Sequence, residues 1–165
     1  MKAQEFKDVA NYLRSLNNVE FQEGKERTAI SRFYYYIFLR LRNEIIFNLD
    51  TRDVIKKLLS SSKAHSLVRR YIKEVARASR SLVGMYYSHI RDISDIEGFL
   101  YQLHDKRKIA DYDIDYAISS EELETVIQLV QEIEQRLSVF ESTLRALNNE
   151  RRLPEIKRLT KDRDS

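Results

Sequence analysis

The scarcity of turn-forming residues constrains the fold of this chain more than any other feature of its sequence. Only three glycines and one proline occur among 165 residues. A many-stranded sandwich or barrel needs frequent turns, so the chain is expected to fold into a few long helices. Its length fits one domain with a single core, and no repeat or linker divides it.

Apolar residues recur at helical spacing along most of the chain. This spacing predicts helices over about 3–16 and 25–49, a short piece at 54–59, and a third long helix after "SSSKAH". The last long helix carries apolar residues in alternating steps of three and four, as in a bundle seam. These residues are Leu123, Val126, Val130, Ile133, Leu137, Phe140, Leu144 and Leu147. The predicted fold is an all-α, up-and-down bundle of four to five helices over 1–150, with a charged, frayed tail over 151–165.

Two capping-box patterns predict where the later helices begin. In "SDIE", Ser94 and Glu97 are spaced to cap a fourth helix that ends near Lys108. Ser119 and Glu122 are spaced in the same way before the last helix. The residues between these helices, "ADYDIDYAI", are expected to form a connector, and the stretch 81–91 is ambiguous because glycine weakens a helix there.

Several classes of protein are excluded or disfavoured by composition. The chain has no cysteine, which excludes disulfides and thiolate zinc sites. Its three histidines lack metal-ligand spacing and no glycine-rich phosphate loop occurs, so no cofactor is expected. The first residues contain no apolar signal segment, and no apolar run is long enough for a membrane span. We therefore expect a cytoplasmic protein.

Charge is unevenly distributed, although the formal net charge is only +3. Nine lysines and arginines face two acids between Arg52 and Arg80, whereas thirteen acids face four bases between Asp92 and Glu141. The basic half could attract phosphate and the acidic half could repel it. The alternative is that both are solvated helix faces.

Two polar groups could bind an anion. Arg32 and Tyr36 are four residues apart in "AISRFYYYIF" and share one helix face. His65 lies at a predicted helix start, and Arg69 and Arg70 follow one turn later. Cations near a helix start can bind phosphate, although a capped helix and tyrosines that pack in the bundle explain the same residues structurally.

The stretch "LHDKRKIADYD" concentrates polar chemistry at the end of the fourth predicted helix. Arg107 and Asp111 are one turn apart, so an ion pair is the structural explanation. The functional explanation is RNA cleavage, in which His104 or Tyr112 would move a proton and Arg107 would hold the phosphate. In either case Arg107, Asp111 and Tyr112 are expected to form a connected cluster that faces the second helix.

Taken together and in this order, "AISRFYYYIF", "KAH" and "RKIADYDID" before an "SSEE" helix start resemble the HEPN superfamily (higher eukaryotes and prokaryotes nucleotide-binding domain). The resemblance implies a dimeric helical bundle with RNA-related work in prokaryotic defence or toxin–antitoxin systems. Many such proteins are metal-independent RNases with an Arg followed by a His, and the paired motifs meet across the dimer. Here Arg107 matches the motif arginine and Tyr112 stands in place of the histidine.

The resemblance therefore favours a module that binds RNA, a nucleotide or a protein partner over an active enzyme. The expected pocket combines Arg32, Tyr36, His65, Arg107, Asp111 and Tyr112, and Arg69 and Arg70 add a basic surface. The alternatives are an active metal-independent endoribonuclease and a structural adaptor bundle. A homodimer is expected because the seam and the tyrosine-rich second helix offer abundant apolar surface. A nucleotidyltransferase-type antitoxin is a possible partner, since some HEPN toxins are modified on a tyrosine near the motif.

Overall fold

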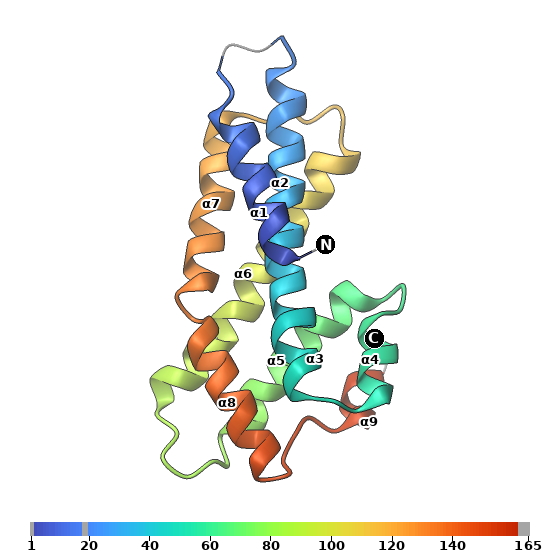
Figure 1. The fold of residues 1–165 in the computed structure, drawn as a ribbon, viewed down its shortest axis with the longest axis vertical. Coiled ribbons are helices and arrows are strands. Elements are labelled where there is room, and N and C mark those ends of the chain that lie inside the picture. Colours follow the sequence, from blue (N-terminus) through green and yellow to red (C-terminus); the bar gives the residue numbers. More distant parts are fainter. Residues whose placement is uncertain (1, 18–19, 162–165) are drawn as a thin grey trace. The chain divides into compact units, whose positions relative to one another are not determined.

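The computed structural model describes residues 2–17 and 20–161, and its regular elements over these ranges are all helical. The elements are α1 (Ala3–Ser15), α2 (Gln22–Leu39), the π-helix η1 (Arg40–Ile46), α3 (Phe47–Leu49), α4 (Asp53–Leu59), α5 (Ala64–Ser79), α6 (Tyr87–Tyr112), α7 (Ser120–Glu134), α8 (Leu137–Asn149) and α9 (Ile156–Thr160) (Figure 1). The predicted all-α fold is confirmed. Seven of the α-helices described have seven or more residues, where four to five were expected.

The chain divides into two compact units instead of the single core expected over 1–150. Unit 1 comprises residues 1–41 and 99–134, and unit 2 comprises residues 42–98 and 135–165. Two of the boundaries fall inside helical segments, after Leu41 in η1 and after Gly98 in α6. No polar or proline-rich linker marks these two boundaries in the sequence, and the sequence therefore predicts one domain.

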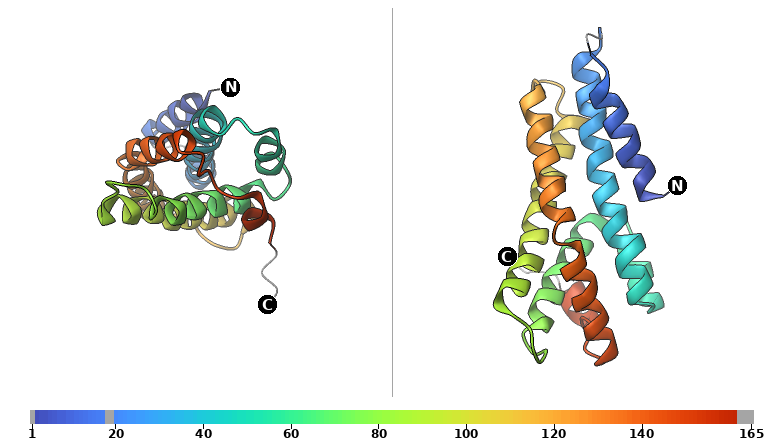
Figure 2. Two further views of the ribbon diagram at one scale, coloured as in Figure 1. Left: turned by 90° about the horizontal axis from the view of Figure 1, so that it is seen from below. Right: turned by 60° about the vertical axis from the view of Figure 1, so that its left-hand side comes forward.

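In unit 1, α2 is the central helix and packs against α1 and α7 (Figures 1 and 2). Its inner face follows the predicted helical spacing, with Ile30, Phe33, Tyr34 and Ile37 all buried. Burial of such large side chains supplies most of the stabilisation of this helix.

In unit 2, α5 packs against α4, α8 and α9. The expected inner face of α5 is buried at Leu67, Val68, Tyr71, Ile72 and Val75. The predicted frayed tail is wrong over Ile156–Thr160, where α9 forms. Leu159 is fully buried and its carbonyl accepts from Arg70, but a five-residue helix is too short to reveal an apolar period. Residues 162–165 of the expected tail lie outside the described residues.

The first capping-box prediction is wrong and the second is correct in part. The helix α6 begins at Tyr87 and passes through Ser94, whose hydroxyl donates to the carbonyl of Ile90 at 3.1 Å. The helix starts shortly after Gly84, whose φ of 77° suits glycine and ends the preceding turn. Ser119 does accept from the backbone N–H of Glu122 at 3.4 Å, one residue before α7 begins.

The apolar seam is buried at all eight predicted positions, but it belongs to two helices. The helix α7 ends at Glu134 and α8 begins at Leu137. The break contains neither glycine nor proline, so the sequence contains no turn signal there. Because the seam is buried inside the chain, it does not provide the apolar surface from which a dimer was expected.

Unit 2 contains a buried carboxylate, Asp50, in a closed hydrogen-bond network. Its side chain is fully buried, and its Oδ2 accepts from the Tyr71 hydroxyl at 2.7 Å and from Arg52 Nη2 at 2.6 Å. Arg52 also donates to the carbonyl of Pro154 at 2.9 Å, which ties this network to the segment before α9. Burial raises the pKa of Tyr71 far above its ordinary value, and the nearby Asp50 charge raises it further, so Tyr71 remains a donor.

Candidate functional site

The predicted polar cluster at the end of α6 is confirmed, and it contains one tyrosine that the sequence did not identify. Arg107 Nε lies 2.6 Å from Asp111 Oδ2. Arg107 Nη2 donates to the Tyr35 hydroxyl at 3.0 Å and to the Tyr112 hydroxyl at 3.4 Å. Tyr35 comes from α2, so the cluster faces the second helix as expected. We call Arg107, Asp111, Tyr35 and Tyr112 the arginine cluster.

The guanidinium of Arg107 also lies over both tyrosine rings, 5.3 Å from the centroid of Tyr35 and 5.3 Å from that of Tyr112. The Arg107 side chain is 12% exposed, whereas Tyr112 is 71% exposed. Burial lowers the pKa of Arg107, but interactions with Tyr35, Asp111 and Tyr112 outweigh it and leave that pKa above its ordinary value. Arg107 is therefore a fixed cation beneath an exposed ring and cannot act as a base.

His104 lies one turn before Arg107 on α6 and contacts a neighbouring tyrosine of α2. Its ring stacks on Tyr34 with 5.3 Å between centroids, and the Tyr34 ring meets Tyr35 edge-on at 5.5 Å. The two residues on α6 thus face adjacent tyrosines on α2. His104 is also the one histidine in the sequence of unit 1.

Arg32 and Tyr36 do not join the arginine cluster through any described contact. The Tyr36 hydroxyl donates to Glu134 at 2.5 Å, and Lys7 pairs with the same carboxylate. Arg32 lies over the ring of Phe6, 5.5 Å from its centroid. The prediction that Arg32 and Tyr36 share one face of α2 is correct. Their partners differ, because Arg32 contacts Phe6 of α1 and Tyr36 donates to Glu134 of α7, so the two residues have separate structural roles.

His65, Arg69 and Arg70 belong to unit 2, whereas the arginine cluster belongs to unit 1. Arg69 donates to Glu97 at 2.8 Å, and Arg70 donates to the carbonyls of Leu159 and Lys161 at the end of α9. These contacts hold α6 and α9 against α5. The start of α5 has no side-chain cap, so the capped-helix explanation of these residues is wrong, and the anion site stays a prediction.

Arg27 is a further residue near this site that the sequence analysis missed. Its Nη1 donates to the carbonyls of Ile109, Ala110 and Asp113 at 3.0–3.2 Å, and its Nη2 donates to that of Tyr116. One guanidinium therefore caps the end of α6 and fixes the connector that follows. Its partners are more than eighty residues away in sequence, so no local pattern could reveal them.

Glu23 completes this clamp from the same helix. Its Oε1 accepts from Arg27 Nη2 at 2.7 Å and from the backbone N–H of Ile118 at 3.3 Å. The hydrogen bond from Arg27, together with that from Ile118, lowers the pKa of Glu23. The connector is thus held at both ends by two residues one turn apart on α2.

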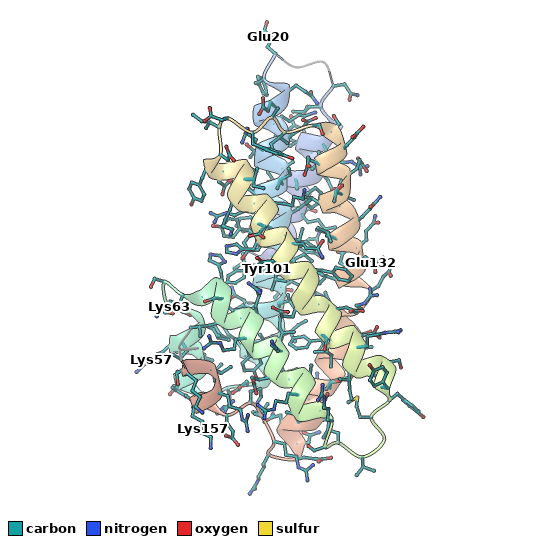
Figure 3. The ribbon with its side chains drawn as sticks, turned by 180° about the vertical axis from the view of Figure 1, so that it is seen from behind. Glu20, Lys57, Lys63, Tyr101, Glu132 and Lys157 are labelled. Atoms are coloured by element: carbon teal, nitrogen blue, oxygen red, sulfur yellow. The ribbon has the colours of Figure 1, made fainter. Side chains whose placement is uncertain are left out.

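Around the arginine cluster, the clamped connector presents an exposed apolar and aromatic corner. Tyr112, Ile114 and Tyr116 are 71%, 84% and 43% exposed. Tyr101, which Figure 3 shows on α6, is also exposed. We call Tyr112, Ile114 and Tyr116 the exposed corner.

The arginine cluster has the chemistry of an anion site. A fixed guanidinium and two tyrosine hydroxyls can hold a phosphate, and an exposed ring can stack on a base. Tyrosine is a poor base at neutral pH, so the cluster itself offers no ready group for proton abstraction. Among the described residues, no group of three metal-ligating side chains occurs, and no helix has the length and apolarity required to cross a bilayer.

Comparisons with known proteins give one similarity and no functional information. The chain is 36% identical over 118 residues to a protein of Methanocaldococcus jannaschii that is named only as uncharacterized. The match covers 70% of this chain and 62% of that protein, so it spans less than two thirds of the relative's length. No family model matches, and no solved structure matches.

Proposed function

We propose that the chain is a HEPN-like module of a prokaryotic defence or toxin–antitoxin system that binds single-stranded RNA or a nucleotide. The observation that carries this proposal is the Arg107 guanidinium held between the rings of Tyr35 and Tyr112 at one end of α6. The charge of Arg107 attracts phosphate, and the exposed ring of Tyr112 offers a stacking platform for a base.

Asp111 sets the strength of this site. Its carboxylate neutralises Arg107 in the free protein, and the Ser31 hydroxyl donates to it at 3.4 Å. A phosphate must compete with Asp111, so the module is expected to bind weakly through one contact and more strongly through a phosphate and a stacked base together.

Binding of a short fluorescent oligouridylate, followed by anisotropy, tests the proposal. Tyr112→Ala is expected to weaken binding by roughly 5- to 150-fold, since a base stacked on an aromatic ring contributes about 1–3 kcal/mol. Arg107→Gln should weaken it as well. Tyr12→Ala is the matched control, because Tyr12 is a 65% exposed tyrosine on α1 outside the cluster. Equal binding by Tyr112→Ala and Tyr12→Ala would contradict the proposal.

An active metal-independent endoribonuclease is the second candidate, and the position of His104 favours it. This histidine lies one turn before Arg107 and contacts Tyr34, next to the tyrosine that binds Arg107. In this candidate His104 takes the proton of the 2′-hydroxyl, and the 2′-oxygen forms a bond to the neighbouring phosphorus while Arg107 holds the phosphate. The P–O5′ bond breaks to leave a 2′,3′-cyclic phosphate, and the 5′-oxygen leaves with the proton from His104. If this candidate is correct, the wild-type chain cleaves RNA in the presence of chelator, and His104→Ala abolishes that cleavage.

Ile114 and Tyr116 of the exposed corner are the residues through which we expect a symmetric dimer to form. Ile114→Asp is expected to convert the dimer to a monomer in light scattering at micromolar concentration, because it places a charge in an apolar interface. Val83→Asp is the control, since Val83 is 98% exposed in unit 2. A monomeric wild type would refute the dimer.

The hydroxyl of Tyr112 would be within reach of a nucleotidyltransferase-type antitoxin in the monomer.

A further inference from the structure

Two adjoining hollows lie on unit 2, with volumes of about 540 and 450 Å³. The helix α5 lines both, and residues 151–161 supply the facing wall. The hollows share Glu74, Arg77 and Arg158, so they form one continuous surface. We call this surface, between α5 and residues 151–161, the basic groove.

The net positive charge of the basic groove exceeds the formal net charge of the whole chain. Nine lysines and arginines line it against three glutamates, an excess of six charges, whereas the formal net charge of the chain is +3. The remainder of the chain is therefore net negative. The two walls of the groove, α5 and residues 151–161, are far apart in the sequence. Solvation of a single helix face would therefore not explain why both walls bring positive charge to one surface.

Four arginines of the groove divide into two groups by their partners. Arg70 and Arg152 donate to backbone carbonyls, those of Leu159 and Ser81 among them, and so build the walls. By contrast, Arg77 lies 3.8 Å from Glu74, and Arg158 lies 3.6 Å from Glu155. Both pairs are long and partly exposed, with Arg77 57% and Arg158 37% exposed. Such pairs contribute little stability, so an incoming anion can replace the glutamate partners.

Arg151 supplies an independent observation. It has a φ of 57°, and it is the one non-glycine residue with positive φ in the described chain. It follows the end of α8, where the N–H of Arg152 donates to the carbonyl of Leu147 at 2.8 Å, a position that usually holds glycine. An arginine here is conformationally unfavourable, yet its side chain lines the groove.

We propose that the basic groove binds the phosphodiester backbone of a single-stranded nucleic acid without reading its bases. Seven of the nine cations are arginines, whose planar forks match phosphate oxygens. No aromatic side chain lines either hollow, so the groove offers no platform for base stacking. This site belongs to unit 2 and does not depend on the arginine cluster.

The salt dependence of oligouridylate binding by the full chain tests this proposal. Between about 50 and 200 mM salt, removal of one arginine–phosphate interaction lowers the slope of log affinity against log salt by about 0.7. Arg77→Gln with Arg158→Gln should therefore lower the slope by about 1.4. The matched control is Arg91→Gln with Arg145→Gln, two exposed arginines of unit 2 outside the groove. Equal slopes for the two double variants would overturn the proposal.

Two further measurements separate the competing explanations. Polyglutamate at equal charge concentration should fail to displace the oligouridylate, and displacement would instead identify a surface for acidic protein. Tyr112→Ala removes no charge and should leave the slope unchanged, so failure of the arginine cluster is distinguishable from failure of the groove.

Arg151→Gly connects the strained backbone to binding. Glycine adopts positive φ without strain, so this variant is expected to raise the melting temperature while lowering the salt slope by about 0.7. A raised melting temperature with an unchanged slope would contradict a binding role for Arg151 and with it the proposal.

Discussion

Asp50→Ala is expected to lower the free energy of unfolding by about 2–3 kcal/mol, because it leaves the buried Tyr71 hydroxyl without an acceptor and Arg52 without its partner. The variant removes the acceptor for the Tyr71 hydroxyl and for two nitrogens of Arg52. Urea denaturation of the full chain measures the change through the midpoint of the transition.

Two milder variants control for this effect. Asp50→Asn keeps an acceptor of similar shape and loses the charge, so its effect should be smaller. Tyr71→Phe removes one hydroxyl and leaves the pair with Arg52, with an expected loss of about 1 kcal/mol. A loss for Asp50→Ala no greater than that for Tyr71→Phe would mean that the ion pair contributes nothing to stability.

Arg27→Ala is expected to release the end of α6, with a loss of about 1.5–3 kcal/mol for the hydrogen bonds made by a charged donor. Four backbone carbonyls lose their shared partner, and Glu23 loses the charge that lowers its pKa. Amide hydrogen exchange should accelerate at Asp113, Tyr116 and Ile118.

Arg27→Lys is expected to fail almost as severely, since an ammonium group lacks the planar fork that reaches several carbonyls at once. Thr28→Ala is the control on the same helix, because the exposed Thr28 side chain contacts only the carbonyl of Gly24 among the described hydrogen bonds. Exchange at the connector that is equally slow in Arg27→Lys and wild type would contradict the clamp.

The sequence predicts the helices well where burial is periodic. The eight seam residues from Leu123 to Leu147 are all buried, as are Ile30, Phe33, Tyr34 and Ile37 of α2. Residues three or four positions apart lie on the same face of a helix and share one environment, so the pattern can be recognised without knowledge of the fold. The break between α7 and α8 interrupts no such pattern, and the sequence therefore shows one helix.

Local spacing also explains which part of the candidate site could be predicted. Arg107, Asp111 and Tyr112 lie within one and a half turns of α6, so their contact depends only on the helix. Tyr35 and Arg27 come from α2, more than seventy residues away from their partners. Their roles depend on how α2 and α6 pack, which no pattern in one segment encodes.

For the C-terminal tail, the sequence predicts less structure than is found. Residues 151–165 are strongly charged, and composition alone favours fraying. One buried leucine, Leu159, and the hydrogen bonds from Arg70 and Arg52 hold the described part of this segment on unit 2. A single anchoring side chain forms no periodic pattern, so the sequence does not reveal it.

Photo-crosslinking in chelator tests the central claim most directly, namely that the arginine cluster binds RNA without cleaving it. The full chain is mixed with RNA that carries a photoreactive thiouridine, irradiated and analysed by mass spectrometry and gel. We expect intact RNA and a cross-link within residues 109–116, centred on Tyr112. Cleaved RNA, or the absence of any cross-link in that segment, would contradict the account.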